Sequence, residues 1–242
     1  MTRDVTLESK QQQFNAAMER YEKIPAYQAI GKMVSLANVL LQVYLLSLVL
    51  PVSIGLPLQL AAFISAYVLT DFLNGLVHMY MDNNDSYDSI AGPLIAAFHL
   101  HHRTPVYKKN PLAIVYFNES GAKNWLVGYL LLAVVLIKTA SVHPLTAYIL
   151  VYVGILSSVA EVSHYCCHTV DGQVTNLLRK AGLFLSKRHH ARHHLMDNMD
   201  YAFLNGLTDP LLNVIARTAY RGYKKTTDLH YAAYTGSGTA NR

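Results

Sequence analysis

The sequence predicts an all-α integral membrane protein with four transmembrane helices, further helices at the membrane surface, and histidine boxes gathered on its cytoplasmic face. Two features of the composition lead to this fold class. Of the 242 residues, 52% are hydrophobic and only 14% are charged, whereas a soluble domain usually carries about 25% charged residues. The apolar residues also fall in long runs, as they do in chains that cross a bilayer.

Four apolar runs approach the length of roughly 20 residues that a helix needs to cross a membrane. The predicted spans cover residues 33–55, 58–81, 125–137 and 144–165. The third run is short, so it must use flanking residues. The aliphatic stem of Lys138 can lie along the apolar region while its ammonium group reaches the interface.

Two further segments mix apolar residues with Lys and Arg, at 176–185 (NLLRKAGLFL) and 209–223 (DPLLNVIARTAYRGY). This composition is typical of helices that lie on a membrane surface. The chain therefore divides into a cytoplasmic N-terminal segment at 1–32, a membrane domain at 33–228 and a flexible tail at 229–242.

The distribution of basic residues predicts the orientation in the membrane. Every Lys and Arg except Lys138 lies before the first span, between the second and third spans, or after the fourth. Because cytoplasmic loops are enriched in Lys and Arg, both termini and the long middle loop are predicted to be cytoplasmic. The formal net charge of +5 follows from this enrichment, so we predict no nucleic-acid partner.

Of the 12 histidines, ten lie at the predicted cytoplasmic ends of spans or in the segments next to them, whereas His143 falls in a turn on the opposite side and His230 in the tail. Residues four apart share one face of a helix, and two imidazoles at that spacing can chelate one metal ion. The boxes at this spacing are His78 with Asp82, His164 with His168, His189 with His193, and His190 with His194. An isolated pair is most often a surface feature, but several boxes on one membrane face predict a metal centre.

Two acids lie within the predicted spans near these boxes. Asp71 precedes His78 at helical spacing, and Glu161 stands in a similar relation to His164 and His168. An acid inside a span is costly and indicates a functional role. We expect Asp71 to accept the outer N–H of a metal-bound imidazole. A polar contact between helices is the alternative for both acids.

The number of candidate ligands is enough for two ions. Imidazole binds Zn, Cu, Fe and Ni alike, but the place of the site at the lipid boundary suits an acyl or alkyl chain. Attack on an unactivated C–H bond needs O₂ and a redox metal, and zinc has no redox chemistry. The sequence therefore predicts two Fe ions that use O₂. Cys166 and Cys167 are adjacent and make no thiolate metal site.

The stretches DFLNGLVHMYMD, FHLHHRTP, VSHYCCH and KRHHARHH followed by YAFLNGLTDPLLN resemble the Kua-type lipid desaturase domain family, over roughly residues 58–213. That family includes plasmanylethanolamine desaturase and the plastid palmitate desaturase that acts on phosphatidylglycerol. The resemblance implies a di-iron membrane desaturase that acts on a lipid-linked alkyl or acyl chain. It also implies O₂ and an external electron carrier, such as cytochrome b5 or ferredoxin with its reductase. The histidines that match the family pattern are His78, His101, His102, His164, His189, His190, His193 and His194.

The chain departs from the family pattern at two positions, near Ile114 and at Ala160, where the family has further histidines. The metal shell would then be completed by other residues. The candidates are His99, His168, Glu161 and Asp82.

Two other functions are also consistent with the sequence. A lipid hydroxylase on the same scaffold would begin with the same hydrogen abstraction. A non-catalytic metal-binding membrane protein is less consistent with the sequence, because transporters hold ions near the bilayer midplane. Lys108, Lys109, Arg188 and Arg192 could dock an acidic carrier or lipid headgroups, or they could form a solvated face.

Overall fold

The structure, a computed structural model, describes residues 7–103, 110–169, 172–196, 198–220 and 222. The predicted tail at 229–242, Lys108 and Lys109 lie outside the described residues, and so do the side chains of His101 and His102. Within the described residues every regular element is a helix, as predicted. The elements are α1 (Leu7–Lys23), α2 (Pro25–Val49), α3 (Gly55–Asp82), α4 (Gly92–Arg103), α5 (Leu112–Glu119), the 3-10 helix η1 (Ser120–Ala122), α6 (Asn124–Thr139), α7 (Pro144–Cys167), α8 (Gln173–Lys180), α9 (Lys187–Leu195) and α10 (Asp209–Ala219).

Within this described part of the chain, three helices, α2, α3 and α7, are long and apolar enough to cross a membrane. A fourth span exists only if α5, η1 and α6 are counted together, and this pair of segments is bent by 91°. The third predicted span corresponds to α6, which has 16 residues and is not long enough by itself to be counted as a span. Three or four such helices are consistent with a membrane protein.

Proline determines where two of the long helices begin. Pro25 and Pro144 stand in the first turns of α2 and α7, where the missing N–H costs nothing and the fixed φ suits a helix. The helix that contains most of the predicted span 33–55 therefore begins at Pro25, and it ends at Val49.

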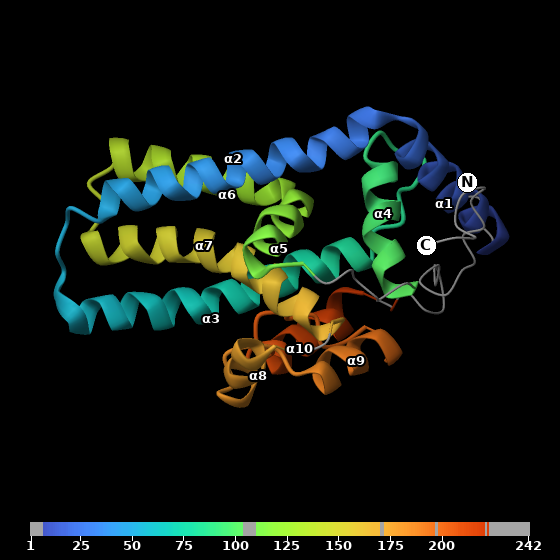
Figure 1. Ribbon diagram of the computed structural model, residues 1–242. Helices are drawn as coiled ribbons and strands as arrows, with labels where there is room; N and C mark the ends of the chain where they lie inside the picture. The colour runs from blue at the N-terminus through green and yellow to red at the C-terminus, as the bar shows by residue number, and fades with distance from the viewer. Residues whose placement is uncertain (1–6, 104–109, 170–171, 197, 221, 223–242) are drawn as a thin grey trace.

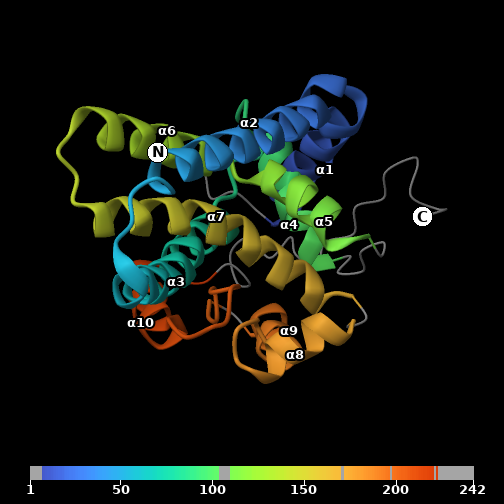
Figure 2. The same cartoon turned by 60° about the vertical axis from the view of Figure 1, so that its left-hand side comes forward.

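The long helices lie side by side in both views of the molecule (Figures 1 and 2). Leu45 of α2, Leu130 of α6 and Val151 of α7 are buried in one apolar cluster between these helices. Gln42 adds a polar link, because its Nε2 donates to the carbonyl of Gly154 at 3.0 Å. The outward faces of α2 and α3 expose many large apolar side chains, as a lipid-facing surface does.

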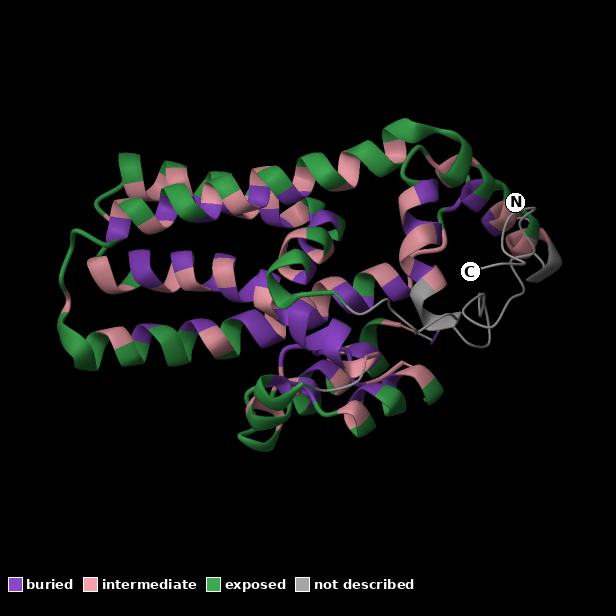
Figure 3. Cartoon of the chain, viewed as in Figure 1, coloured by how far each residue is buried: buried purple, intermediate pink, exposed green. Residues whose placement is uncertain are grey.

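The C-terminal helices α8, α9 and α10 pack beneath the ends of α3 and α7 (Figures 1 and 2). Both segments that the sequence assigns to the membrane surface contain helices, α8 and α10, which expose Leu177 and Leu211 respectively. Figure 3 shows buried residues concentrated where α3 and α7 meet these C-terminal helices. The best-shielded part of the molecule therefore lies at this junction.

The helix α4 is held over the end of α3 by α1. Phe14 and Met18 of α1 pack with Tyr87 and with Ile95 of α4 in a second buried cluster. The Phe14 ring meets the Tyr87 ring edge-on, with centroids 5.4 Å apart. This packing brings α4 to the same junction as α3, α7 and α9.

Candidate metal centre

Three groups of side chains among the described residues could each hold a metal ion, and two of them lie where α3 and α7 meet α9. The four-histidine cluster consists of His164, His168, His190 and His194. The mixed cluster consists of His78, Asp82 and His193. Within each group, one potential ligand atom of every residue lies within 4.8 Å of those of the others.

The four-histidine cluster joins the end of α7 to α9. The Nε2 atom of His190 lies 2.8 Å from that of His168 and 2.8 Å from that of His194. The Nε2 atoms of His164 and His168 are 3.4 Å apart. Four ring nitrogens therefore converge on one small volume, which is the arrangement that imidazole ligands take around a shared cation.

The electrostatics of this cluster keep His168 and His190 in the form that binds metal. Burial and, to a smaller extent, the neighbouring His164 and His193 lower the pKa of His168 to about 3. Burial and the surrounding histidines also hold the pKa of His190 well below its usual range. Both imidazoles are thus neutral near pH 7, and only a neutral imidazole can act as a ligand.

The mixed cluster joins the last turn of α3 to α9. The Oδ2 atom of Asp82 lies 3.5 Å from Nε2 of His78 and 3.3 Å from Nε2 of His193. All three side chains are buried. Burial opposes protonation of His193, but the Asp82 carboxylate outweighs it and raises the pKa of His193. This carboxylate therefore makes the pocket favourable for positive charge.

Backbone carbonyls orient the two imidazoles of the mixed cluster. His78 Nδ1 lies 2.8 Å from the carbonyl oxygen of Tyr201, and His193 Nδ1 lies 2.9 Å from that of Met199. A carbonyl can only accept, so each Nδ1 carries the proton and donates it. The Nε2 lone pair of each ring is then directed at the cluster, which is how partners behind a ligand fix its tautomer.

The two clusters are immediate neighbours because α9 contributes to both. The ring centroids of His190 and His193 are 5.8 Å apart, and those of His193 and His194 are 5.6 Å apart. Across the junction, the centroids of His78 and His164 lie 6.4 Å apart. The arrangement can therefore place two ions close to each other.

Glu161 lies behind the four-histidine cluster. Its Oε2 atom is 3.7 Å from Nδ1 of His164, and its Oε1 atom is 2.9 Å from Nζ of Lys123. Lys123 is buried, its ammonium group also donates to the side-chain oxygen of Asn74, and it lies 4.8 Å from the ring centroid of Phe203. Glu161 thus contacts a candidate ligand from outside the cluster.

The sequence pattern does not identify Lys123 as part of the site, because Lys123 is one of several basic residues between the second and third predicted spans. The bend between η1 and α6 turns its side chain inward, and no local pattern encodes that turn. The only signal available was its position immediately before an apolar run.

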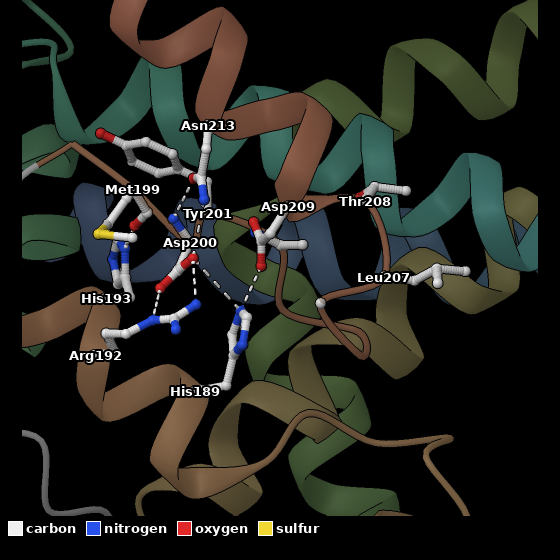
Figure 4. A network of polar contacts seen from close by, with 12 residues as sticks. His189, Arg192, His193, Met199, Asp200, Tyr201, Leu207, Thr208, Asp209 and Asn213 are labelled. Carbon is white, nitrogen blue, oxygen red and sulfur yellow. Dashed lines mark hydrogen bonds and ion pairs between the residues drawn. The ribbon is translucent and has the colours of Figure 1, made fainter.

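The side chain of His189 contacts different residues from those that its neighbours on α9 contact. Its Nε2 lies 2.5 Å from the carboxylate of Asp209, and Arg192 forms an ion pair with Asp200 beside it (Figure 4). Asp209 also accepts from the backbone N–H of Ala202 at 2.9 Å. These acids could bind a cation, but Arg192 already balances Asp200. The structure thus places His189 in a network that fastens α9 to α10, outside both clusters.

His99 also lies outside both clusters. Its Nε2 is 2.8 Å from the carbonyl of Met81, so this nitrogen carries the proton, and Nδ1 accepts from the Tyr87 hydroxyl at 2.6 Å. Burial lowers the pKa of His99, which keeps the ring in this neutral form. The ring therefore ties α4 to the end of α3.

Asp71 is buried on the histidine face of α3, as the sequence predicts, but the structure does not pair it with an imidazole. Its carboxylate accepts from the backbone N–H groups of Asn205, Gly206 and Thr208, at 3.0, 3.3 and 2.9 Å. The Thr208 hydroxyl donates a further bond at 2.8 Å. Asp71 therefore fixes the loop that precedes α10, because unpaired N–H groups there would otherwise be buried.

Neither of the two departures from the family pattern supplies a ligand. Ala160 is buried in an apolar cluster with Leu185 and Leu204, and Ile114 is exposed on α5. His168, one of the residues expected to complete the metal shell, lies within the four-histidine cluster.

The comparisons with known proteins give one match. The profile of a protein family described as a lipid desaturase domain matches residues 67–218. This range contains both clusters. No curated protein and no solved structure matches the chain significantly.

Proposed function

Because the chain belongs to the lipid desaturase domain family, we propose that it is a di-iron membrane desaturase that uses O₂ to form a double bond in a lipid-linked alkyl or acyl chain. The single observation that carries the proposal is the adjacency of the two clusters. Seven described side chains converge there, six with imidazole nitrogens and one with a carboxylate. Imidazole and carboxylate together suit non-haem iron.

The residues present fit two iron ions. His164, His168, His190 and His194 would hold one ion, and His78, Asp82 and His193 the other. Bound iron would supply the activation of O₂ and the abstraction of hydrogen from an unactivated C–H bond. The overall reaction takes two hydrogens from adjacent carbons, consumes O₂, two electrons and two protons, and forms two waters.

The protein's own contribution is orientation and exclusion of water. The Tyr201 and Met199 carbonyls hold the His78 and His193 rings in one tautomer. The Phe203 ring packs against His78 and His164, with centroids 5.0 and 5.3 Å away. A dry, apolar wall of this kind protects a reactive site from water.

We further propose that the termini and both clusters face the cytoplasm. The proposal follows from the positive-inside rule. The substrate would then come from the adjacent leaflet, since three or four helices of the described residues are able to cross the bilayer.

Electrons would come from a separate carrier such as cytochrome b5 or ferredoxin with its reductase. A surface groove of about 470 Å³ runs along α9 and is lined by Arg188, Arg192 and Leu195. The same helix carries His190 and His193 on its buried face. An acidic carrier docked in this groove would stand one helix away from the metals.

Metal analysis and product analysis together test the proposal. The purified protein should contain close to two irons per chain, and a lipid product two hydrogens lighter than the substrate should form only with O₂ and a reductant. A product heavier by one oxygen would instead identify the hydroxylase. Stoichiometric zinc without O₂-dependent activity would refute both and support a non-catalytic metal-binding protein.

A further inference from the structure

A cavity of about 260 Å³ lies between α1, α2, α4 and the bend at η1. The residues on which the argument depends are Tyr27, Met81, Leu94, Ala97, Phe98 and Asn124. We propose that this cavity binds a segment of the alkyl or acyl chain of a membrane lipid and presents it to the mixed cluster. The inference rests on the proposed function, because it specifies where the substrate chain lies.

The inner end of the cavity adjoins the mixed cluster. Phe98 lines the cavity, and its ring meets the His78 ring edge-on with centroids 5.9 Å apart. Met81, also in the lining, directly precedes Asp82. His99 holds the Met81 carbonyl at 2.8 Å and so keeps α4 against α3. The wall between the cavity and the cluster is therefore about one side chain thick.

The outer end of the cavity is polar and exposed. Asn118, Ala122 and Asn124 line it and are exposed at the bend before α6. Trp125 follows directly, and Tyr27 also lines the cavity. Aromatic residues beside polar ones are typical of the level where a span meets the lipid headgroups.

The lining of the cavity changes from polar at its exposed end to apolar near the cluster, as a lipid changes from its headgroup to its hydrocarbon chain. The lining side chains that adjoin the cluster, Met81 and Phe98, are apolar, and the amides of Asn118 and Asn124 lie at the exposed end. Leu94 and Ala97 add further apolar lining. A polar head at the exposed end would leave the hydrocarbon chain pointing at His78. Sites for whole ligands usually measure about 300–1,000 Å³, so this smaller cavity fits a chain segment and leaves the headgroup outside.

Photolabelling of the full-length purified protein tests the proposal without turnover. The probe is a 1-O-alkyl lysophospholipid with a diazirine on its chain, added under nitrogen to the protein with its metals as purified. We expect label on the peptide containing Leu94 and Ala97, reduced by excess unlabelled lipid. The variant Ala97→Phe fills the cavity and should lower this labelling by about tenfold. The control Ala113→Phe, at an exposed position on α5, should leave it unchanged.

A second variant keeps the test decisive if Ala97→Phe does not fold. Leu94→Ala enlarges the cavity and should increase labelling by a branched-chain probe relative to a linear one. Label spread over the outer faces of α2 and α3, and the same in every variant, would overturn the cavity proposal even if the protein desaturates a lipid. A further outcome separates the two proposals. If the wild-type protein has neither iron nor O₂-dependent activity but is labelled in the cavity, and Ala97→Phe loses that label, the lipid site is supported and only the proposed function is refuted.

Discussion

Replacing Lys123 by Met should strongly destabilise the protein, although Lys123 is not a candidate ligand. Lys123 is 3% exposed, and its Nζ lies 2.9 Å from the carboxylate of Glu161. Met keeps most of the volume and removes the charge, which leaves the Glu161 carboxylate buried beside His164 without its cation. Breaking a buried pair in this way costs about 3–5 kcal/mol.

The thermal midpoint in detergent measures this effect. At about 2–4 °C per kcal/mol for a chain of this size, Lys123→Met should lower the midpoint by about 6–20 °C. The double variant Lys123→Met/Glu161→Gln removes both charges and should recover at least half of that loss, because no uncompensated charge remains. The protein's single Trp, Trp125, lies next to the site of change and can report unfolding.

The matched control is Lys138→Met at the other end of α6. The Lys138 ammonium is exposed, and its contact with the Tyr44 hydroxyl is 3.3 Å long, so the change should cost no more than about 0.5 kcal/mol. Equal midpoints for Lys123→Met and Lys138→Met would refute the reasoning. So would a double variant that is no more stable than Lys123→Met.

Three further predictions follow from the two clusters and their surroundings. His168→Ala should lower the iron content to about half of the wild-type value and abolish activity. His99→Ala should lower the thermal midpoint and leave the metal content unchanged. Equal metal loss in both variants would contradict the placement of His168 inside the four-histidine cluster and of His99 outside it. Asp71→Ala removes four hydrogen bonds to the loop before α10 and should lower the free energy of unfolding by at least about 1–3 kcal/mol. Limited proteolysis between Tyr201 and Asp209 should then be faster. Unchanged cleavage would show that other contacts hold the loop. His143→Ala removes the imidazole that accepts from the backbone N–H of Leu145 at the start of α7. The free energy of unfolding should fall by about 0.5–2 kcal/mol, while the activity per folded molecule stays at the wild-type value. A loss of activity at normal stability would contradict the placement of the metal centre away from His143.

Local chemistry alone determined much of this protein. The apolar runs and their flanking prolines specify the long helices. Apolar side chains are stabilised by burial against lipid or against any apolar part of the protein, so these helices can be predicted without knowing what they pack against. The four-residue spacing specifies that His164 shares a face with His168, and His190 with His194. The family membership also followed from these local stretches, and the match at 67–218 confirms it.

The number of spans was less well determined. The third apolar run was expected to cross the membrane with help from its flanks, but α6 is preceded by a bend of 91°. A sharp bend depends on what packs inside it. Here the amide of Asn38 donates to the carbonyls of Ser120 and Lys123, at 3.0 and 3.3 Å, and Asn38 lies far away in the sequence.

Only the tertiary structure decided which residues of the boxes meet. His189 and His190 are adjacent, yet a rotation of about 100° per residue turns one toward Asp209 and the other into the four-histidine cluster. The sequence gives the spacing on α9 but not the rotation of α9 relative to α7. Asp71 was expected to meet an imidazole, and it binds a loop more than a hundred residues away. Lys123 was expected in a loop, and it is buried against Glu161. In each case helix packing brings the partner from a distant part of the chain. Packing depends on the whole set of side chains at the junction, whereas the spacing of residues along one helix depends only on the backbone repeat.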